Sequence, residues 1–167
     1  MSTMQAKLDE EDQITDTTDQ FLTFILGNEE YGIEILKVQE IKSWGPFTPI
    51  PNAPEYVLGV INLRGAIVPI VDLRSRFGLP PQEYTTTTAI IIVHTEVDDQ
   101  PRIIGLVVDQ VSEVYHLGAD VIQNVDETSS GIDKGFIRGY GKIEEKLVIL
   151  VNLDPIIASS MEPESTS

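Results

Sequence analysis

The chain carries one sequence pattern twice, and this duplication limits the folds that it can adopt. Residues 31–41, YGIEILKVQEI, align with residues 104–114, IGLVVDQVSEV, at an offset of 73 positions. Residues 68–73, VPIVDL, align with residues 148–153, VILVNL, at an offset of 80 positions. Self-similarity of this kind is typical of a duplicated structural unit. The chain is therefore expected to contain two copies of one strand-rich unit.

Residues 59–73, GVINLRGAIVPIVDL, predict a β-hairpin. Its two halves are rich in valine and isoleucine, and β-branched residues favour strands over helices. Asn62 and Gly65 are expected to support the turn, because an asparagine side chain can bond nearby backbone and glycine can adopt a positive φ. Arg64 would then be exposed at the tip. Pro69 has no N–H to donate, so the second strand is expected to lie at a sheet edge or to carry a bulge.

Other segments also predict strands rather than long helices. Residues 21–35 predict a second hairpin, with glycine and asparagine in its turn. Residues 35–41 fit either a short helical turn or a twisted strand, and the four threonines at residues 85–88 are expected to begin the strand that follows them. Neither copy contains the helix of about 12 residues that a parallel crossover requires. The sequence therefore predicts an all-β fold of two small β-barrels in tandem, and Asp154 with Pro155 predicts a short C-terminal helix.

Composition excludes several classes of function. Among 167 residues, 27 are acidic and 11 are basic, which gives a net charge of −16. Such a field repels phosphate backbones, so nucleic acid is not an expected partner, and the excess of acid also aids solubility. The chain has no cysteine, which removes disulfides, thiol nucleophiles and cysteine metal sites. Neither a membrane span nor a secretory signal is evident, so we expect a soluble, intracellular protein.

No motif in the sequence predicts an enzyme. The two histidines, His94 and His116, have no serine and carboxylate arrangement beside them that would indicate a catalytic triad. Residues 139–141, GYG, are half of a dinucleotide fingerprint and open no predicted helix. Asp98 and Asp99 fit a hairpin loop better than a metal site. We therefore expect no catalytic residue, no cofactor and no bound metal.

The segments quoted above resemble the CheW-like domain, the module of the CheW chemotaxis coupling proteins. The resemblance rests on NLRG followed by an apolar P-x-x-DL strand, with GNEEYGIEILKVQEI before it and GLVVDQVSEV and KLVILVNLD after it. It covers about residues 20–157. The resemblance implies a non-enzymatic adaptor built from two Src-homology-3-like five-stranded β-barrels in tandem. The same module also occurs in the CheA kinase and in CheV.

The resemblance also implies partners and a location. It implies binding to the cytoplasmic tip of a methyl-accepting chemoreceptor and to the regulatory domain of CheA, without membrane insertion. The protein would be cytoplasmic and recruited to membrane-associated receptor clusters. The expected organisation is a disordered acidic tail over residues 1–19, a CheW-like domain over residues 20–160 and a mobile tail over residues 161–167. The barrels are expected at about residues 20–83 and 84–151, and strand exchange between them is left open.

The resemblance further suggests where a receptor would bind. In the family, the receptor's helical hairpin docks in the groove between the barrels. The internal repeat independently pairs Val38 with Val111 and Ile41 with Val114, and a pseudo-symmetric apolar cleft would suit the apolar stripe of a partner helix. The residues that match the family's receptor-binding positions are Ile35, Val38, Glu40, Ile41, Arg64, Val111 and Val114.

Each of these residues also has a simpler interpretation. Aliphatic residues at such spacings usually face a core, and Arg64 could be ordinary surface. Glu40 could pair with a receptor cation or be solvated. For the kinase, the glycine-rich turn expected at residues 135–142 is the candidate contact. The alternative function is a CheV-like or other tandem-barrel module that binds polypeptides outside the receptor–kinase complex.

Overall fold

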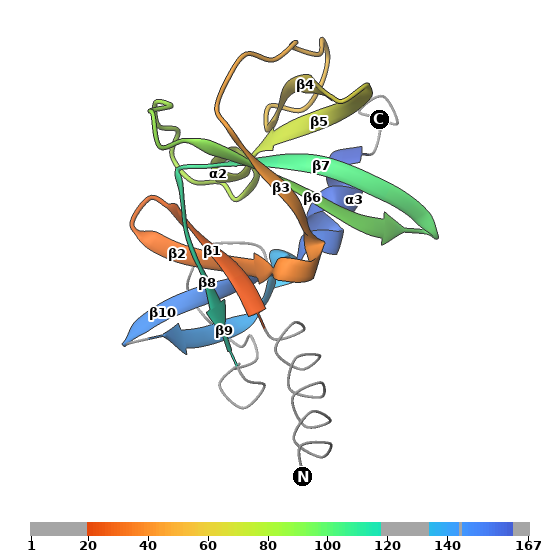
Figure 1. Cartoon of the computed structure of the whole chain (residues 1–167). Coiled ribbons are helices and arrows are strands. Elements are labelled where there is room, and N and C mark those ends of the chain that lie inside the picture. Colours follow the sequence, from red (N-terminus) through yellow and green to blue (C-terminus); the bar gives the residue numbers. More distant parts are fainter. Residues whose placement is uncertain (1–19, 118–133, 144, 162–167) are drawn as a thin grey trace, which may run out of the picture.

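The computed structural model describes residues 20–117, 134–143 and 145–161, so the two expected tails lie outside the described residues except for Met161. Within the described residues the chain forms ten strands in two five-stranded sheets, shown one above the other in Figure 1. In chain order the elements are β1 (Gln20–Leu26), β2 (Glu29–Glu34), the 3-10 turn η1 (Ile35–Lys37), β3 (Val38–Ser43), β4 (Val57–Leu63), β5 (Ala66–Asp72), α2 (Leu73–Arg76), β6 (Ala89–Val97), β7 (Gln100–Val108), β8 (Gln110–His116), η3 (Lys134–Phe136), β9 (Ile137–Ile143), β10 (Lys146–Val151) and α3 (Leu153–Met161).

Each sheet takes strands from both copies of the repeat. One sheet has the order β8-β1-β2-β10-β9, and the other has the order β3-β6-β7-β5-β4. The first copy supplies β1 to β5 and the second copy supplies β6 to β10. When the copies are matched in this order, β1 corresponds to β6 and β2 to β7, and each pair holds the same two places in its sheet. The sheets therefore do not follow the expected division near residue 83. We call the sheet with β1 the N/C barrel, because it joins the two ends of the domain, and the sheet with β3 the central barrel.

The exchange is visible in two parallel strand pairs. In the central barrel Ile70 on β5 lies opposite Gly105 on β7, and in the N/C barrel Leu150 on β10 lies opposite Gly32 on β2. These are the positions that the sequence repeat equates. A Cβ atom at Gly105 would lie 2.9 Å from Cγ2 of Ile70, so glycine allows the two strands to pack closely here. Each parallel pair joins one strand of the first copy to one of the second.

The buried side chains form three clusters, of which one joins the two barrels. The largest lies between the two sheets, with Phe24 and Ile33 from the N/C barrel, Ile91 and Leu106 from the central barrel, and Ile156 from α3. Each barrel also has a smaller interior cluster of its own. Strand residues alternate between these clusters because successive side chains point to opposite faces. The all-β fold, the two five-stranded barrels and the short C-terminal helix are thus confirmed.

Several local predictions need correction. Of the two expectations for the Pro69 strand, the edge position is wrong, since β5 pairs with both β4 and β7. The ladder between β4 and β5 does carry an irregularity, a register shift between Val57 and Gly59. The pairing of β5 with β7 runs from Ile70 to Asp72, so Pro69 lies just before it. Residues 85–88 form a turn rather than the start of a strand, and the Thr85 N–H donates to Oγ1 of Thr88. Threonine hydroxyls can stabilise turns in this way. The ambiguous residues 35–41 divide into η1 and β3.

The glycine-rich segment at residues 135–142 is not a turn. Most of it belongs to β9, and the hairpin that joins β9 to β10 turns at Glu145, whose φ is 72°. Ile143 pairs with Lys146 across this turn, as Leu63 pairs with Ala66 in the first copy. Among the helices of the described segments, none is long and apolar enough to span a membrane.

Candidate partner-binding site

The β4–β5 turn presents Arg64 in a fixed geometry. Arg64 and Gly65 are its two central residues and have φ values of 52° and 91°. A two-residue hairpin turn with both φ values positive matches the right-handed twist of the strands that it joins. Oδ1 of Asn62 accepts a hydrogen bond from the Gly65 N–H at 3.0 Å. Asn62 and Gly65 therefore hold the turn, and the side chain of Arg64 is 67% exposed.

Arg64 is paired within the protein. Its Nη2 atom lies 3.2 Å from Oε2 of Glu40 on β3. Oε2 of Glu40 is shielded from solvent, and the Glu40 side chain is 28% exposed. Since β3 and β4 are the two ends of the central sheet, this ion pair joins the ends of that sheet beside a backbone bridge from Thr48 to Val60. Glu40 was expected to pair with a receptor cation or to be solvated; within the protein it pairs with Arg64 and is partly shielded from solvent.

The five aliphatic residues of the predicted site divide into two groups. Ile35, Val38 and Val111 are half-buried and pack against the core between the barrels. Ile41 and Val114 each expose 47% of their surface. None of the five is fully buried inside one barrel. They lie instead at the margin of the shared core, with the two exposed residues on edge strands of different barrels.

The register of the strands repeats around these residues. On β3, Val38 lies opposite Val93 and Ile41 lies opposite Ile91. On β8, Val111 lies opposite Phe24 and Val114 lies opposite Leu22. Both ladders shift register between their two pairs. The structure therefore gives the repeat-related residues equivalent positions, one set on each barrel.

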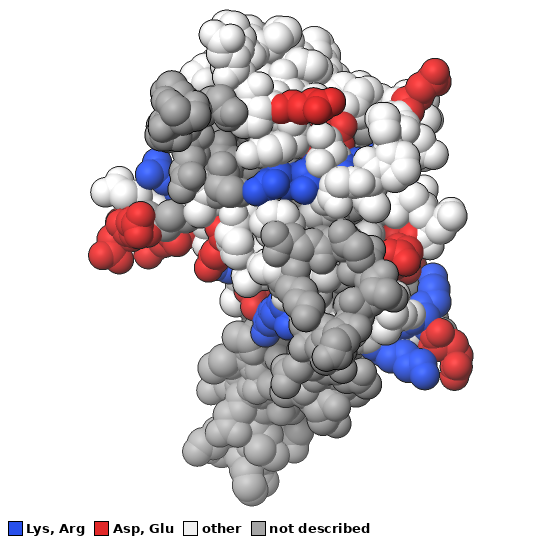
Figure 2. Space-filling model, turned by 180° about the vertical axis from the view of Figure 1, so that it is seen from behind, with Lys and Arg blue, Asp and Glu red and all other residues white. Residues whose placement is uncertain are grey.

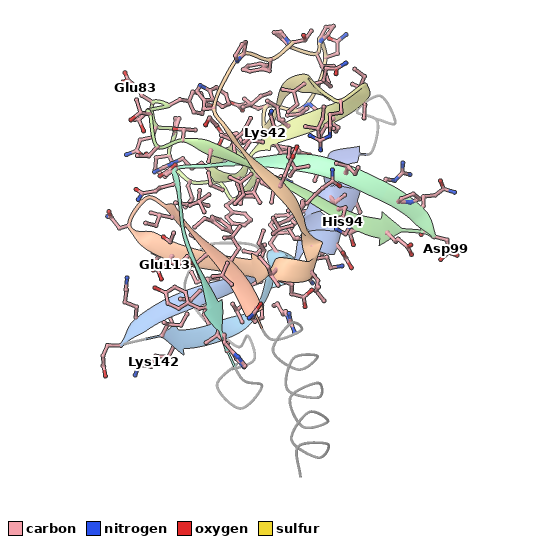
Figure 3. All side chains as sticks on the ribbon, viewed as in Figure 1. Lys42, Glu83, His94, Asp99, Glu113 and Lys142 are labelled. Atoms are coloured by element: carbon pink, nitrogen blue, oxygen red, sulfur yellow. The ribbon has the colours of Figure 1, made fainter. Side chains whose placement is uncertain are left out.

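The two copies differ in charge at this site. Glu113 is the repeat equivalent of Glu40, and it is exposed on β8 (Figure 3). Its backbone accepts a hydrogen bond from Thr23 at 2.9 Å. The position equivalent to Arg64 lies in the β9–β10 turn, where the sequence has glutamate at 144 and 145. Arg64 beside Glu40 therefore has no counterpart at the repeat-equivalent positions 144 and 113, which are both glutamate.

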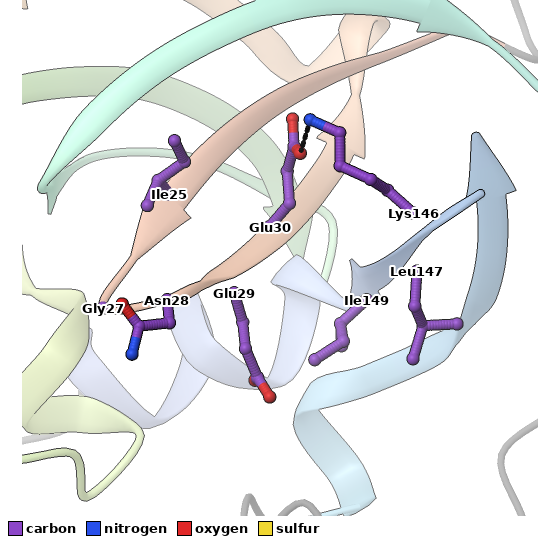
Figure 4. Close-up of a pocket in the computed structure, with 8 residues that line it drawn as sticks. All are labelled: Ile25, Gly27, Asn28, Glu29, Glu30, Lys146, Leu147 and Ile149. Carbon is purple, nitrogen blue, oxygen red and sulfur yellow. Dashed lines mark ion pairs between the residues drawn. The ribbon is translucent and has the colours of Figure 1, made fainter. Parts of the chain in front are cut away.

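A separate hollow of about 470 Å³ lies at the end of the N/C barrel (Figure 4). Ile25, Leu147 and Ile149 form its apolar part, and Leu147 is largely exposed. At its margin Nζ of Lys146 lies 3.4 Å from Oε1 of Glu30. The lining residues come from the β1–β2 turn and β10, so this hollow is not part of the predicted receptor site. It lies instead beside the strands considered for the kinase.

The described surface has no concentration of charge of one sign on the face in Figure 2 and no candidate metal site. Figure 2 shows acidic and basic side chains in separate small groups on the back face, with no broad basic patch among the residues coloured there. In the described part of the chain, no group of three or more histidine or carboxylate side chains could hold a metal ion. His94 is exposed on β6.

Sequence reasoning missed one buried charge pair. Arg74 in α2 donates from Nε to Oδ1 of Asp109 at 2.9 Å and from Nη2 to Oδ2 at 2.7 Å, and the Arg74 side chain is only 8% exposed. Burial alone would raise the pKa of Asp109, but hydrogen bonds from Arg74 and from the Gly27 backbone outweigh burial and lower it. The hydrogen bond to Asp109 raises the pKa of Arg74. No local motif marks this pair, because its members are far apart in the sequence.

Comparison with known proteins agrees with this fold. The family model described as the CheW-like domain matches residues 20–161. The chain belongs to the CheW-like domain family. This CheW-like chain is 41% identical over 140 residues to the chemotaxis protein CheW of Klebsiella aerogenes, covering 84% of this chain and 82% of that protein.

Two further relatives of this CheW-like chain are informative. The crystal structure of the scaffolding protein TtCheW from Thermoanaerobacter tengcongensis matches with a TM-score of 0.74 and 35% identity, over 81% of this chain and 90% of that one. The chemotaxis protein CheV3 of Helicobacter pylori is 30% identical over 76% of this chain, but the match covers only 40% of that protein. The CheW relatives are thus matched over most of their length, and the CheV relative is not.

Proposed function

We propose that the protein is a non-enzymatic chemotaxis adaptor that binds the cytoplasmic tip of a methyl-accepting chemoreceptor and the regulatory domain of CheA. Membership of the CheW-like family supports the adaptor role, and a solved relative is described as a scaffolding protein. The protein would act in the cytoplasm, at receptor clusters on the membrane. It would bring the kinase under receptor control without chemistry of its own.

The matched exposure of Ile41 and Val114 carries the proposal for the receptor site. Each residue extends the apolar margin of the shared core to the surface, one from each barrel. A helical hairpin offers the apolar stripe that such a surface binds. Arg64 would add a fork of N–H donors suited to a receptor carboxylate. Ile35, Val38 and Val111 would support the apolar surface, and Glu40 would hold Arg64 in place.

For the kinase we propose the N/C barrel around β9 and β10. β9 is an edge strand, and edge strands carry backbone groups that can pair with another chain. The exposed Leu147 and the hollow in Figure 4 lie beside it. This surface is distinct from the proposed receptor site, so both partners could bind at once.

The proposal is tested by reconstitution. Receptor-bearing membranes and CheA are mixed with the purified chain and sedimented, and kinase activity is measured with and without the chain. We expect the chain to sediment with the membranes, to increase the CheA in the pellet and to place kinase activity under receptor control. A chain that binds neither partner would favour a CheV-like or other polypeptide-binding role outside this complex.

A further inference from the structure

Asp109 lies where the chain passes from one barrel to the other. It is the single residue between β7 in the central barrel and β8 in the N/C barrel. Its N–H donates to the carbonyl of Ile25 at 3.1 Å, and its Oδ2 accepts from the Gly27 N–H at 2.8 Å, both in the N/C barrel. Its carbonyl accepts from Oγ1 of Thr87, just before β6, at 3.0 Å. Asp109 therefore bonds to both barrels.

Arg74 holds the same residue from the central barrel. It lies in α2, directly after β5, and its guanidinium contacts both carboxylate oxygens of Asp109. Its remaining donors bond the Pro80 carbonyl at 2.7 Å and Oε1 of Gln82 at 2.5 Å. A planar guanidinium with two parallel bonds to one carboxylate fixes direction as well as distance. Rotation of one barrel relative to the other would break several of these bonds together.

The other crossing is held by side chains that are more exposed to solvent. The chain passes from β2 to β3 through η1, where Nζ of Lys37 lies 3.7 Å from Oδ1 of Asp154 in α3. Asp154 is the repeat equivalent of Arg74, but Lys37 is equivalent to Gln110 rather than to Asp109, so the two ion pairs lie at neighbouring and not equivalent positions of the repeat. The side chains of Lys37 and Asp154 are 31% and 59% exposed. Exposed ion pairs contribute little by themselves. Here the buried Thr95 on β6 joins the two members, since its Oγ1 accepts from Nζ of Lys37 at 3.0 Å and donates to Oδ1 of Asp154 at 2.7 Å.

We infer that Asp109 and Arg74 are positioning residues that set the orientation of the N/C barrel relative to the central barrel. The inference rests on the proposed function for its consequence at the receptor site. β8 starts at the residue after Asp109 and carries Val111 and Val114, whereas Val38 and Ile41 lie on β3 of the other barrel. A change of angle at Asp109 therefore changes the distance between the apolar residues of β3 and those of β8, which a receptor helix would contact in the proposed complex.

The orientation can be measured directly because the chain has no cysteine of its own. Gln100→Cys on β7 and Lys142→Cys on β9 place one exposed spin label on each barrel, near Asp99 and at Lys142 in Figure 3. Electron–electron double resonance then gives the distribution of distances between the barrels. The test variants are Asp109→Asn, and Arg74→Met combined with Asp109→Asn, which leaves no unpaired charge at the pair.

The matched control is Arg138→Gln. Arg138 on β9 pairs with Glu34 on β2, within the N/C barrel and next to η1, so its loss removes an arginine–carboxylate pair without touching Asp109 or Arg74. Circular dichroism and urea unfolding establish that each variant is folded. Binding of a soluble receptor-tip fragment is measured on the same samples. The same distance measurement on Lys37→Ala tests whether the crossing from β2 to β3 also sets the orientation of the barrels.

We expect a narrow distribution in the parent protein and in Arg138→Gln, and a broader or shifted one in both test variants. If only a tenth of the molecules keep the binding orientation, affinity for the receptor fragment falls by about tenfold. An unchanged distribution in folded test variants overturns the inference. If the parent protein binds no receptor fragment, the proposed function fails, and the distance measurement still decides the inference.

Discussion

Ile41 and Val114 occupy equivalent positions on edge strands of different barrels and expose equal fractions of their surface, 47% each. Each lies opposite a buried aliphatic residue of the neighbouring strand, Ile91 and Leu22. The repeat thus brings two apolar residues to the surface at the margin of one shared core. This relationship leads to the first prediction.

Replacing either residue with aspartate should weaken receptor binding with little loss of stability. Surface substitutions usually change the free energy of unfolding by about 0.5 kcal/mol or less. Loss of a central apolar contact at an interface costs about 1–2 kcal/mol or more, which is about tenfold in affinity. Calorimetric titration with a receptor-tip fragment checks Ile41→Asp and Val114→Asp. Ile50→Asp, an exposed isoleucine in the proline-rich loop, is the control and should bind as the parent does.

Val38→Asp should behave differently. Val38 packs against the shared core, so a carboxylate there is placed in apolar surroundings and should destabilise the fold by about 1–3 kcal/mol. Urea unfolding followed by the fluorescence of Trp44, the one tryptophan, measures the loss. A Val38→Asp protein as stable as Ile41→Asp would contradict the half-buried position of Val38.

The Arg64–Glu40 pair allows a charge-swap test. Arg64→Glu should place two carboxylates together and abolish receptor-dependent kinase activation, while stability falls by only about 1 kcal/mol or less because the pair is partly exposed. Combining Arg64→Glu with Glu40→Arg should restore stability. It should not restore activation, because in the proposed complex the receptor contacts a cation at position 64. Recovery of kinase activation by the double variant would show that the ion pair alone matters.

Two glycines in strands should respond differently to alanine. A Cβ at Gly59 would lie 2.1 Å from the Thr48 carbonyl oxygen and 2.8 Å from a ring carbon of Phe47, so backbone must move. At Gly32 the nearest atom is a Leu150 side-chain carbon at 3.3 Å. Gly59→Ala should therefore cost at least about 1–3 kcal/mol, and Gly32→Ala clearly less. Urea midpoints compare them, and equal midpoints would refute the close approach at Gly59.

Acid should remove the contribution of Asp109 to stability. Its folded pKa is lower than the ordinary value of 3.8, because bonds from Arg74 and Gly27 outweigh burial, which acts to raise it. A lowered carboxyl pKa stabilises the fold at pH above the unfolded value, and this stability is lost as pH falls through the folded pKa. Urea unfolding from neutral pH to about pH 3 should show the stability difference between the parent and Asp109→Asn narrowing below about pH 4. If the stability difference stays constant with pH, the pKa of Asp109 is the same in the folded and the unfolded states.

The sequence predicted the repeat, both hairpins and the Arg64 turn, because these depend on local residue preferences. It could not predict the strand exchange. Gly32 and Gly105 have the same surroundings in the repeat, so Ile70 could pair with either of them, and only the three-dimensional path of the chain selects Gly105. The threonines at residues 85–88 were assigned to a strand because their β propensity was weighed above the ability of their hydroxyls to bond a turn.

The site was predicted as separate residues rather than as pairs. Resemblance to the family indicated Glu40 and Arg64, but not that they contact each other across the ends of one sheet. Asp109 lies inside the quoted segment GLVVDQVSEV and Arg74 directly follows the P-x-x-DL strand, but nothing in either segment indicates that the two side chains contact each other. Charged residues that meet through tertiary contacts leave no periodic signal in a sequence.

The interleaved strands of the two copies make neither half of the polypeptide self-sufficient. A chain with a single copy would have two or three strands for each barrel and could complete both only by lending strands to an identical molecule. Joining the two copies end to end makes that encounter unimolecular, so assembly no longer depends on protein concentration. The tandem chain is, in its architecture, a strand-swapped dimer carried by one polypeptide.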